Sequence, residues 1–358
     1  MDNQKKAIIA MSGGVDSSVA AFLMKERGFD CVGATMKLYD NDDIIAEDKK
    51  TCCSLSDIDD ARAVAYSMGM KYYVFNFKDE FKKEVIDRFV NTYICGGTPN
   101  PCIDCNKYLK FEKMLNRMYE LGYDYIVTGH YARIAFDENS GRYILKKGRD
   151  LSKDQSYVLY NMTQEQLAHT LLPLGEYEKT EIRRIADENG FVNAKKKDSQ
   201  DICFVPTGDY AAFIEQYCKK SFPEGEFVDR QGNVLGTHKG IIRYTVGQRK
   251  GLGLSLKAPM YVYEKDVDNN RVILSDNESL FSNELVAENV NWVSIEKPDE
   301  PIRAKVRIRY SHREAPATVY PKGDSVRVVF DEPQRGITKG QSAVIYDGDI
   351  LLAGGVII

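Results

Sequence analysis

The chain has 358 residues, of which 43% are hydrophobic, and a formal net charge of −4. This length allows two or three domains with separate cores, and the acidic balance excludes a uniformly basic nucleic-acid binder but not one with a local basic face. No apolar run approaches the ~20 residues that cross a bilayer, and no signal-peptide core precedes the first predicted strand. We therefore expect a cytoplasmic protein without a membrane partner.

A glycine-containing segment, Ser12–Ser18 (SGGVDSS), lies between an apolar run and an amphipathic stretch that stops at Gly28. This order predicts a strand, a tight turn and a helix start, where backbone N–H groups and the helix dipole favour a phosphate. No lysine follows the glycines, so the segment is not a Walker loop. A lone Gly-Gly would more often be an ordinary turn, but seven residues in this order favour a phosphate site.

Strands and helices alternate along the first third of the chain. We expect strands at Cys31–Leu38, Lys71–Phe77 and Tyr125–Thr128, and helices at Asp57–Met68, Asp79–Ile94 and Lys107–Leu121. Repeated units of this kind predict a parallel sheet with helices on both faces and a ligand site at the carboxyl ends of its strands. The glycine segment, Met36, Gly129 and His130 fall at those ends.

The rest of the chain no longer shows a regular alternation of strands and helices. A helical region is expected over 163–189, followed by a charged loop that includes Lys195, Lys196 and Lys197, and short strands with glycine turns after residue 206. We predict an α/β fold with three domains: a parallel-sheet nucleotide-binding domain (1–206), a small, mainly β central domain (207–286) and a barrel-like β domain (287–358).

Cysteines mark two further segments. The prolines of Thr98–Lys107 (TPNPCIDCNK) predict an extended loop that delivers Cys105 near the N-terminus of the following helix, where a thiol pKa is lowered. A single C-x-x-C pair can be half a zinc site, a redox pair or chance, and the lack of a second pair or a nearby histidine argues against zinc. Cys203 alone would more often be a core thiol. We expect Cys31, Cys95 and Cys218 to be packing residues and assign no role to Cys52 and Cys53.

A basic strand is expected near the C-terminus. Arg303, Lys305, Arg307 and Arg309 alternate with Ala304, Val306, Ile308 and Tyr310, which on a strand gives one basic and one apolar face. A solvated strand face is the simpler interpretation, but such a concentration of cations in an acidic chain fits phosphate contacts. Further candidates for contacts with a nucleic-acid backbone are Lys195, Lys196, Lys197, Arg243, Arg249 and Lys250.

Taken together, these segments resemble the tRNA-specific 2-thiouridylase family of the ATP pyrophosphatase (PP-loop) superfamily, over essentially the whole chain. The motifs that carry the resemblance are Ser12–Ser18, Met36, the TPNPC-x-x-CNK segment, Thr128–Ala132, Lys153–Tyr157, Asp198–Phe204, Thr245–Gly251 and Arg309-Tyr310. The resemblance implies an adenine nucleotide alpha hydrolase-like catalytic domain and sulfur transfer to the wobble uridine of tRNA.

The resemblance also implies roles for individual residues. ATP, with Mg²⁺, would bind Ala10, Met11, Ser12, Gly13, Gly14, Val15, Asp16, Ser17, Met36 and Gly129. The uridine O2 would attack the α-phosphate, Cys203 would carry the sulfur as a persulfide, and Cys105 would release it and form a disulfide with Cys203. The target base and tRNA would contact Asn100, Pro101, Cys102, His130, Lys153, Asp154, Gln155, Arg309, Tyr310 and Gln341. The implied partners are tRNA, with Glu, Gln and Lys acceptors, and a sulfur donor such as a cysteine desulfurase or relay protein.

Cys102 departs from members of the family that carry an aspartate there. A thiol cannot serve as a carboxylate base, so either that role is dispensable or Cys102 does something else. One alternative is that Cys102, Cys105 and Cys203 hold a 4Fe-4S cluster with one iron open to carry sulfur. Other users of the same glycine segment stay open as well. Amide-forming synthetases do not need the two cysteines, argininosuccinate synthase-like enzymes lack a basic β tail, and a lysidine synthetase uses an amine nucleophile. A tRNA-binding or redox-sensing module would not consume ATP when tRNA is added.

Overall fold

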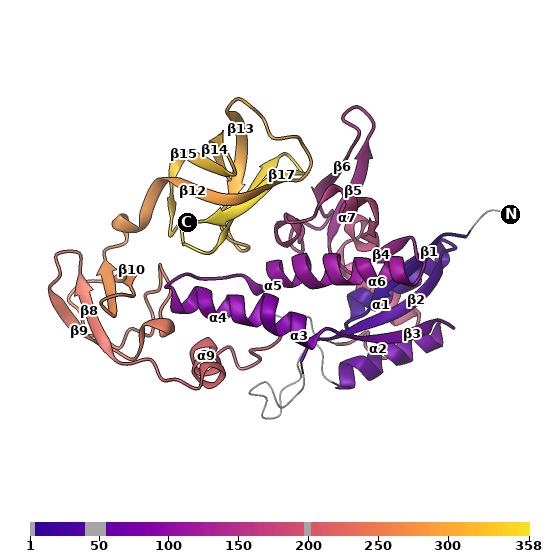
Figure 1. Ribbon diagram of the computed structural model, residues 1–358, viewed down its shortest axis with the longest axis horizontal. Coiled ribbons are helices and arrows are strands. Elements are labelled where there is room, and N and C mark those ends of the chain that lie inside the picture. The colour runs from indigo at the N-terminus through magenta and orange to yellow at the C-terminus, as the bar shows by residue number, and fades with distance from the viewer. Residues whose placement is uncertain (1–3, 40–54, 197–201) are drawn as a thin grey trace.

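The structure is a computed structural model that describes residues 4–39, 55–196 and 202–358 (Figure 1). Cys52, Cys53, and Lys197 to Asp201 of the motifs above lie outside the described residues. The described chain forms a parallel-sheet part, a small central β part and a C-terminal barrel, which confirms the predicted fold class. No helix in the described ranges is long and apolar enough to cross a membrane.

A five-stranded parallel sheet organises the N-terminal part, with strand order β3-β2-β1-β4-β7. Its strands are β1 (Lys6–Ala10), β2 (Asp30–Lys37), β3 (Lys71–Asn76), β4 (Tyr125–Val127) and β7 (Thr170–Leu171). The order reverses at β1, because β2 pairs with one of its edges and β4 with the other. In open sheets, ligands bind beyond the carboxyl end of the strand at such a switch point.

Helices cover both faces of this sheet. They are α1 (Val15–Glu26), α2 (Leu55–Ser67), α3 (Lys78–Phe81), η2 (Lys82–Ile86), α4 (Asp87–Ile94), α5 (Pro101–Asp104), η3 (Cys105–Lys113), α6 (Met114–Glu120), α7 (Gln164–Ala168) and α8 (Lys179–Glu188), with short 3-10 turns η4 (Ser156–Leu159) and η5 (Pro173–Glu176). Neighbouring β1 residues face opposite ways, so Ile8 packs in one core cluster with Phe89, and Ile9 packs in another with Val19. We call the first of these the Phe89 cluster.

Two helix predictions need correction. The helix expected from Lys107 begins six residues earlier, at Pro101, because Asn100 caps it: the Asn100 Oδ1 accepts from the Cys102 N–H (3.2 Å), and proline suits the first helical position. The extended loop therefore ends at Asn100. The helical region expected over 163–189 consists of α7 and α8, separated by the edge strand β7.

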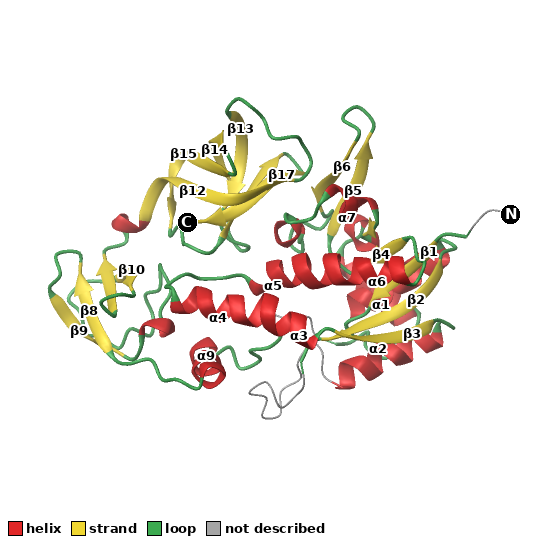
Figure 2. Cartoon of the chain, in the orientation of Figure 1, coloured by secondary structure: helices red, strands yellow, loops and turns green. Residues whose placement is uncertain are grey.

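The central part contains one helix beside a four-stranded sheet (Figure 2). Its elements are α9 (Tyr210–Cys218), β8 (Gly225–Asp229), β9 (Val234–His238), η6 (Ile241–Arg243), β10 (Tyr261–Asp266) and β11 (Arg271–Ser275). Phe213, Phe227 and Val262 belong to the Phe89 cluster, so the core of this part continues that of the parallel sheet.

The C-terminal part is a six-stranded closed barrel, since β12 pairs with both β15 and β17. Its elements are η7 (Glu278–Leu280), β12 (Phe281–Trp292), β13 (Ile302–Arg307), β14 (Ala315–Lys322), β15 (Ser325–Arg335), β16 (Ser342–Asp347) and β17 (Ile350–Ile357). An unpredicted hairpin, β5 (Ala132–Asp137) and β6 (Arg142–Lys147), extends this sheet by pairing β6 with β17. The hairpin thereby joins the barrel to the N-terminal part.

Candidate active site

The glycine segment forms an open cradle at the start of α1. Gly13 has φ +72°, and a Cβ there would stand 2.4 Å from the Asp57 carbonyl oxygen, so the turn requires glycine. Gly14 is the N-cap residue, and no side chain caps the helix. The first N–H groups of a helix have no intrahelical acceptor, so those of α1 are suited to phosphate oxygens.

Side chains hold the cradle in shape. The Ser17 hydroxyl donates to the Gly14 carbonyl (3.0 Å) and accepts from the Ser12 N–H (3.2 Å). The buried Asn193 amide donates to the Gly13 carbonyl (3.0 Å) and to the Ser18 hydroxyl (2.9 Å). The loop is therefore preorganised, which favours binding of a flexible polyphosphate.

A lysine that the sequence did not single out reaches the cradle. Lys179, in the first turn of α8, places its Nζ 2.8 and 2.7 Å from the two carboxylate oxygens of Asp16, and the Tyr131 hydroxyl donates to the same carboxylate (2.7 Å). The glycine segment has no lysine of its own, but the fold supplies one from far along the chain. No motif surrounds Lys179, so only the tertiary structure reveals it.

Lys196 ties the cradle to the segment that leads to Cys203. Its Nζ lies 3.2 Å from the Gly13 carbonyl oxygen and 2.5 and 2.8 Å from carboxylate oxygens of Asp57 and Asp60. Burial opposes its charge, but the two carboxylates outweigh this effect and raise the pKa of Lys196. This lysine was predicted as a tRNA contact, and the structure instead shows it in an ion-pair network at the loop.

Gly129 and Met36 lie at the same edge of the sheet. A Cβ on Gly129 would come within 2.9 Å of the Asp16 carbonyl carbon and the Ser17 nitrogen, so its backbone packs against the first turn of α1. Met36 is half-buried near the end of β2 and packs on the Phe89 cluster.

The two predicted reactive cysteines pack against one core. Cys105, at the start of η3, and Cys203 are both half-buried and contact the Phe89 cluster. The Tyr39 hydroxyl donates to the Cys203 carbonyl (3.2 Å), and the next residue, Phe204, is buried against Phe89. Segments far apart in sequence are thus brought to the same region.

The expected low pKa of Cys105 is wrong for this conformation. Because the helix begins at Pro101, Cys105 lies beyond its first turn, and burial raises the pKa of its thiol to about 11, with only partial opposition from Lys110. Burial also raises the pKa of the neighbouring Asp104 to about 6, against Arg88 and Lys107.

The cluster alternative is not matched by the arrangement of ligands. Among the residues that the structure describes, no three histidine, cysteine or acidic side chains are grouped to hold a metal ion. Cys102, Cys105 and Cys203 therefore do not form a three-thiolate set here, and we derive no step through an iron–sulfur cluster.

Several residues assigned to tRNA have structural contacts. Asp154 is 5% exposed, and its carboxylate accepts from Gly148, Ser156 and Arg307. Burial raises the pKa of Asp154 despite these hydrogen bonds. The Gln155 Oε1 accepts from the Tyr131 N–H (3.0 Å). These two side chains shape the loop that also carries Lys153.

Tyr310 and Cys102 share one neighbourhood. Tyr310 is 40% exposed, and its hydroxyl donates to the Asp154 carbonyl (3.3 Å). Burial raises the Tyr310 pKa, Asp154 and Cys102 add to the effect, and Arg307 and Lys153 oppose it. Helix α5, which carries Cys102, therefore converges with the loop at Lys153 and the barrel.

His130 is a buried residue of the N-terminal part. Its Nδ1 is 2.7 Å from the Thr128 hydroxyl, and its ring lies 6.0 Å from that of Phe111. Burial, aided by Lys110, lowers the His130 pKa well below its usual value, so the imidazole is neutral near pH 7. A neutral imidazole can donate or accept one hydrogen bond toward a base.

The predicted basic strand is shorter than expected. β13 ends at Arg307, and the chain then turns, with the His312 N–H bonded to the Arg309 carbonyl (3.0 Å), so Tyr310 is exposed rather than part of the apolar face. The Arg309 guanidinium points inward to the Gly336 carbonyl and the Thr338 hydroxyl. Gln341 likewise donates to the Thr98 carbonyl (2.7 Å).

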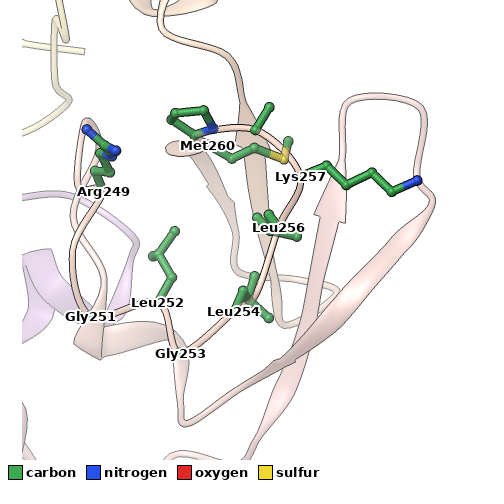
Figure 3. Close-up of a pocket in the computed structure, with 10 residues that line it drawn as sticks. Arg249, Gly251, Leu252, Gly253, Leu254, Leu256, Lys257 and Met260 are labelled. Atoms are coloured by element: carbon green, nitrogen blue, oxygen red, sulfur yellow. The ribbon is translucent and has the colours of Figure 1, made fainter.

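A hollow of ≈ 330 Å³ lies in the central part, away from the cradle (Figure 3). Glycines and aliphatic side chains line it together with Arg249 and Lys257, and Figure 3 shows Arg249 across the hollow from Leu256 and Met260. Such a lining suits binding rather than acid–base chemistry.

Comparisons with known proteins agree with this arrangement. Family profiles match residues 5–207 as a tRNA methyl transferase HUP domain, 211–276 as a tRNA methyl transferase PRC-barrel domain and 282–357 as an aminomethyltransferase beta-barrel domain. The chain is 53% identical over 354 residues to the tRNA-specific 2-thiouridylase MnmA of Clostridioides difficile (strain 630), covering 99% of this chain and 98% of that relative. The chain belongs to the tRNA-specific 2-thiouridylase family.

A second 2-thiouridylase, from Acetivibrio thermocellus, is 54% identical over 357 residues, covering 99% of both chains. Among solved structures, a 4-thiouridine synthetase–RNA complex with bound ATP matches 60% of this chain and 50% of its own, with TM-score 0.37 and 20% identity. The three profile ranges follow the three parts of this 2-thiouridylase family member.

Proposed function

We propose that the chain is an ATP-dependent tRNA-modifying transferase that replaces O2 of the wobble uridine by sulfur, giving 2-thiouridine. The observation that carries the proposal is the pairing of an uncapped α1 cradle with Cys105 and Cys203 on one core, in a chain more than half identical to 2-thiouridylases. The cradle binds the ATP that activates the uridine oxygen, and the two cysteines carry and release the sulfur.

The first step is adenylation. The N–H groups at the start of α1 bind the phosphates, and Lys179 places a positive charge beside the loop where pyrophosphate departs. The uridine O2 attacks the α-phosphate, the bond to the β-phosphate breaks, and pyrophosphate leaves. A uridine oxygen is a poor leaving group by itself, whereas AMP is a good one.

The second step is sulfur transfer. The thiolate of Cys105 attacks the inner sulfur of a Cys203 persulfide, which forms the Cys105–Cys203 disulfide and releases hydrosulfide. Hydrosulfide adds to C2, AMP leaves, and the proton of the sulfur is lost as C2=S forms. A dithiol reductant then restores both cysteines. Because burial raises the pKa of Cys105, its proton must be removed within the complex.

The tRNA is held by the surface where the Cys102, Lys153 and Tyr310 segments converge. A base in a loop must be unstacked to reach such a site. We propose Glu, Gln and Lys tRNAs as acceptors and a cysteine desulfurase or relay protein as the persulfide donor. Asn100, Pro101 and His130 are the proposed base contacts, and ATP is the activating substrate, with Mg²⁺.

The test is reconstitution with unmodified tRNA, ATP, L-cysteine and a desulfurase, followed by mass spectrometry of the nucleosides. We expect tRNA-dependent pyrophosphate release and 2-thiouridine from the native chain. Cys105→Ser and Cys203→Ser should keep pyrophosphate release and lose 2-thiouridine. Pyrophosphate release that does not depend on tRNA, or thiolation by Cys203→Ser, would contradict the proposal.

A further inference from the structure

A buried lysine of the central part reaches the segment that leads to Asn100 and Cys102. Lys265, on β10, is 8% exposed, and its Nζ donates to the Gly97 carbonyl (3.3 Å) and lies 5.7 Å from the ring centroid of Tyr93. Within the described ranges, no carboxylate forms an ion pair with this ammonium. Its partners are one neutral carbonyl and one aromatic face.

The carbonyl that Lys265 contacts lies where the chain leaves α4. Gly96, with φ +81°, ends the helix, and the Gly96 and Gly97 N–H groups bond back to the Tyr93 (3.1 Å) and Thr92 (2.8 Å) carbonyls. The negative end of the helix dipole lies here, so an ammonium is electrostatically suited to the place.

The C-terminal part forms hydrogen bonds with Thr98, the residue after Gly97. The Thr98 N–H donates to the Lys339 carbonyl (2.9 Å), and the Gln341 amide donates to the Thr98 carbonyl (2.7 Å). A Cβ on Gly340 would stand 3.1 Å from the Thr98 nitrogen, so the two backbones pack tightly. Two residues later, Asn100 caps the helix that carries Cys102 and Cys105.

Gly97 and Thr98 are thus fixed from the central part on one side and from the barrel on the other. A buried ammonium with so few partners costs stability, and groups of this kind are retained at functional sites. We propose that Lys265 is a positioning residue that holds Gly97 and thereby sets the direction of the segment that presents Asn100 and Cys102 to the target base. This inference rests on the proposed function.

The experiment compares Lys265→Met with Lys239→Met, the same substitution at an exposed lysine of the same part. Three quantities are measured for each full-length protein: kcat for tRNA-dependent thiolation, the Kd for tRNA by filter binding, and Tm. We expect Lys265→Met to lower kcat about tenfold, as a misplaced reacting segment does, with the Kd within twofold of native and Tm equal or higher. Lys239→Met should resemble the native chain.

An unchanged kcat, or a kcat and tRNA affinity that fall together, would overturn the positioning role. Gly97→Ala gives a second route, because its Cβ would stand 2.7 Å from the Thr92 Cγ2 and displace the same turn. If Lys265 acts through Gly97, the two substitutions are not additive in kcat. Should Lys265→Met fail to fold, an unchanged kcat in Gly97→Ala overturns the inference. If the native chain does not thiolate tRNA, the proposed function fails instead.

Discussion

The ammonium of Lys179 bonds both carboxylate oxygens of Asp16, at 2.8 and 2.7 Å, inside the phosphate cradle. The pair joins α8 to the first turn of α1, and Lys179 is only 8% exposed. It pairs the one carboxylate of the loop with a buried cation, and an unpaired carboxylate at that place would repel an anion. The cradle therefore depends on a contact between segments 163 residues apart.

Replacing Lys179 by Met should impair adenylation. We expect tRNA-dependent pyrophosphate release to fall about 10²-fold, as for loss of one preorganised electrostatic contact, because Asp16 keeps its charge and loses its counterion. Tyr131→Phe removes one neutral hydrogen bond to the same carboxylate and is the matched control, with an expected loss below tenfold. Equal losses in the two variants would show that the lysine charge is not the cause.

Replacing Lys196 should lower the thermal stability of the protein and weaken its use of ATP, whereas replacing the neighbouring Lys195 should change neither. Lys196→Ala removes the ammonium that pairs with Asp57, which is 4% exposed, and breaking such a partly buried pair costs about 1–3 kcal/mol once the exposure of Lys196 is allowed for. We expect a Tm several degrees lower and a higher KM for ATP. Lys195→Ala, at an exposed position, should leave both unchanged. If Lys195→Ala and Lys196→Ala changed Tm and the KM for ATP equally, the ion pairs of Lys196 would not be the cause.

Much of the fold is visible in the sequence because it depends on local patterns. Apolar runs and glycine stops indicate β1, β2 and α1, and alternation indicates the barrel strands. The hairpin β5–β6 is not predicted as part of the barrel sheet, because its pairing partner, β17, lies about 200 residues away. Lys179 is missed and Lys196 is assigned to tRNA for the same reason, since their acidic partners meet them only in the folded chain.

Two predictions that the sequence makes about the site are wrong, each for a physical reason that the structure shows. The alternation of Arg303 to Arg309 indicates a strand, but a turn at Arg309 ends the pattern, and that guanidinium points inward. The pKa of Cys105 was predicted from helix position alone. Burial is a property of packing, and it moves the pKa in the opposite direction.

Sulfur release should accelerate with pH. The pKa of Cys105 is raised to about 11, so the fraction of thiolate, and with it the rate, increases about tenfold per unit as long as the pH stays below that value. Single-turnover thiolation with Cys203 already persulfidated, measured between pH 7 and 9, checks this. Pyrophosphate release in Cys105→Ser reports on adenylation alone and is the control. A thiolation rate that levels off near pH 7 would mean that tRNA binding lowers the thiol pKa.

Lys265 should make stability rise with pH. Burial lowers its folded-state pKa from 10.5 to about 8, so the unfolded chain binds this proton more tightly. The destabilisation is complete below pH 8 and is relieved as the pH rises from 8 to 10.5, by a total on the order of 3 kcal/mol. The free energy of unfolding of the native chain, relative to Lys265→Met, should increase over that window. A constant difference would show that the folded and unfolded chains bind this proton equally tightly, so that burial does not lower the Lys265 pKa.

Substitutions of Arg309 and Lys153 should distinguish a residue that holds the fold together from one that contacts an RNA phosphate. The Arg309 guanidinium bonds the Gly336 carbonyl and the Thr338 hydroxyl and lies 3.4 Å from the Val246 carbonyl of the central part. Arg309→Ala should therefore lower Tm and weaken tRNA binding without changing its salt dependence. Lys153→Ala should reduce the slope of log Kd against log salt by about 1, as loss of one phosphate contact does. Filter binding across a salt series measures both slopes. A reduced slope in Arg309→Ala with native Tm would instead place Arg309 at the RNA backbone.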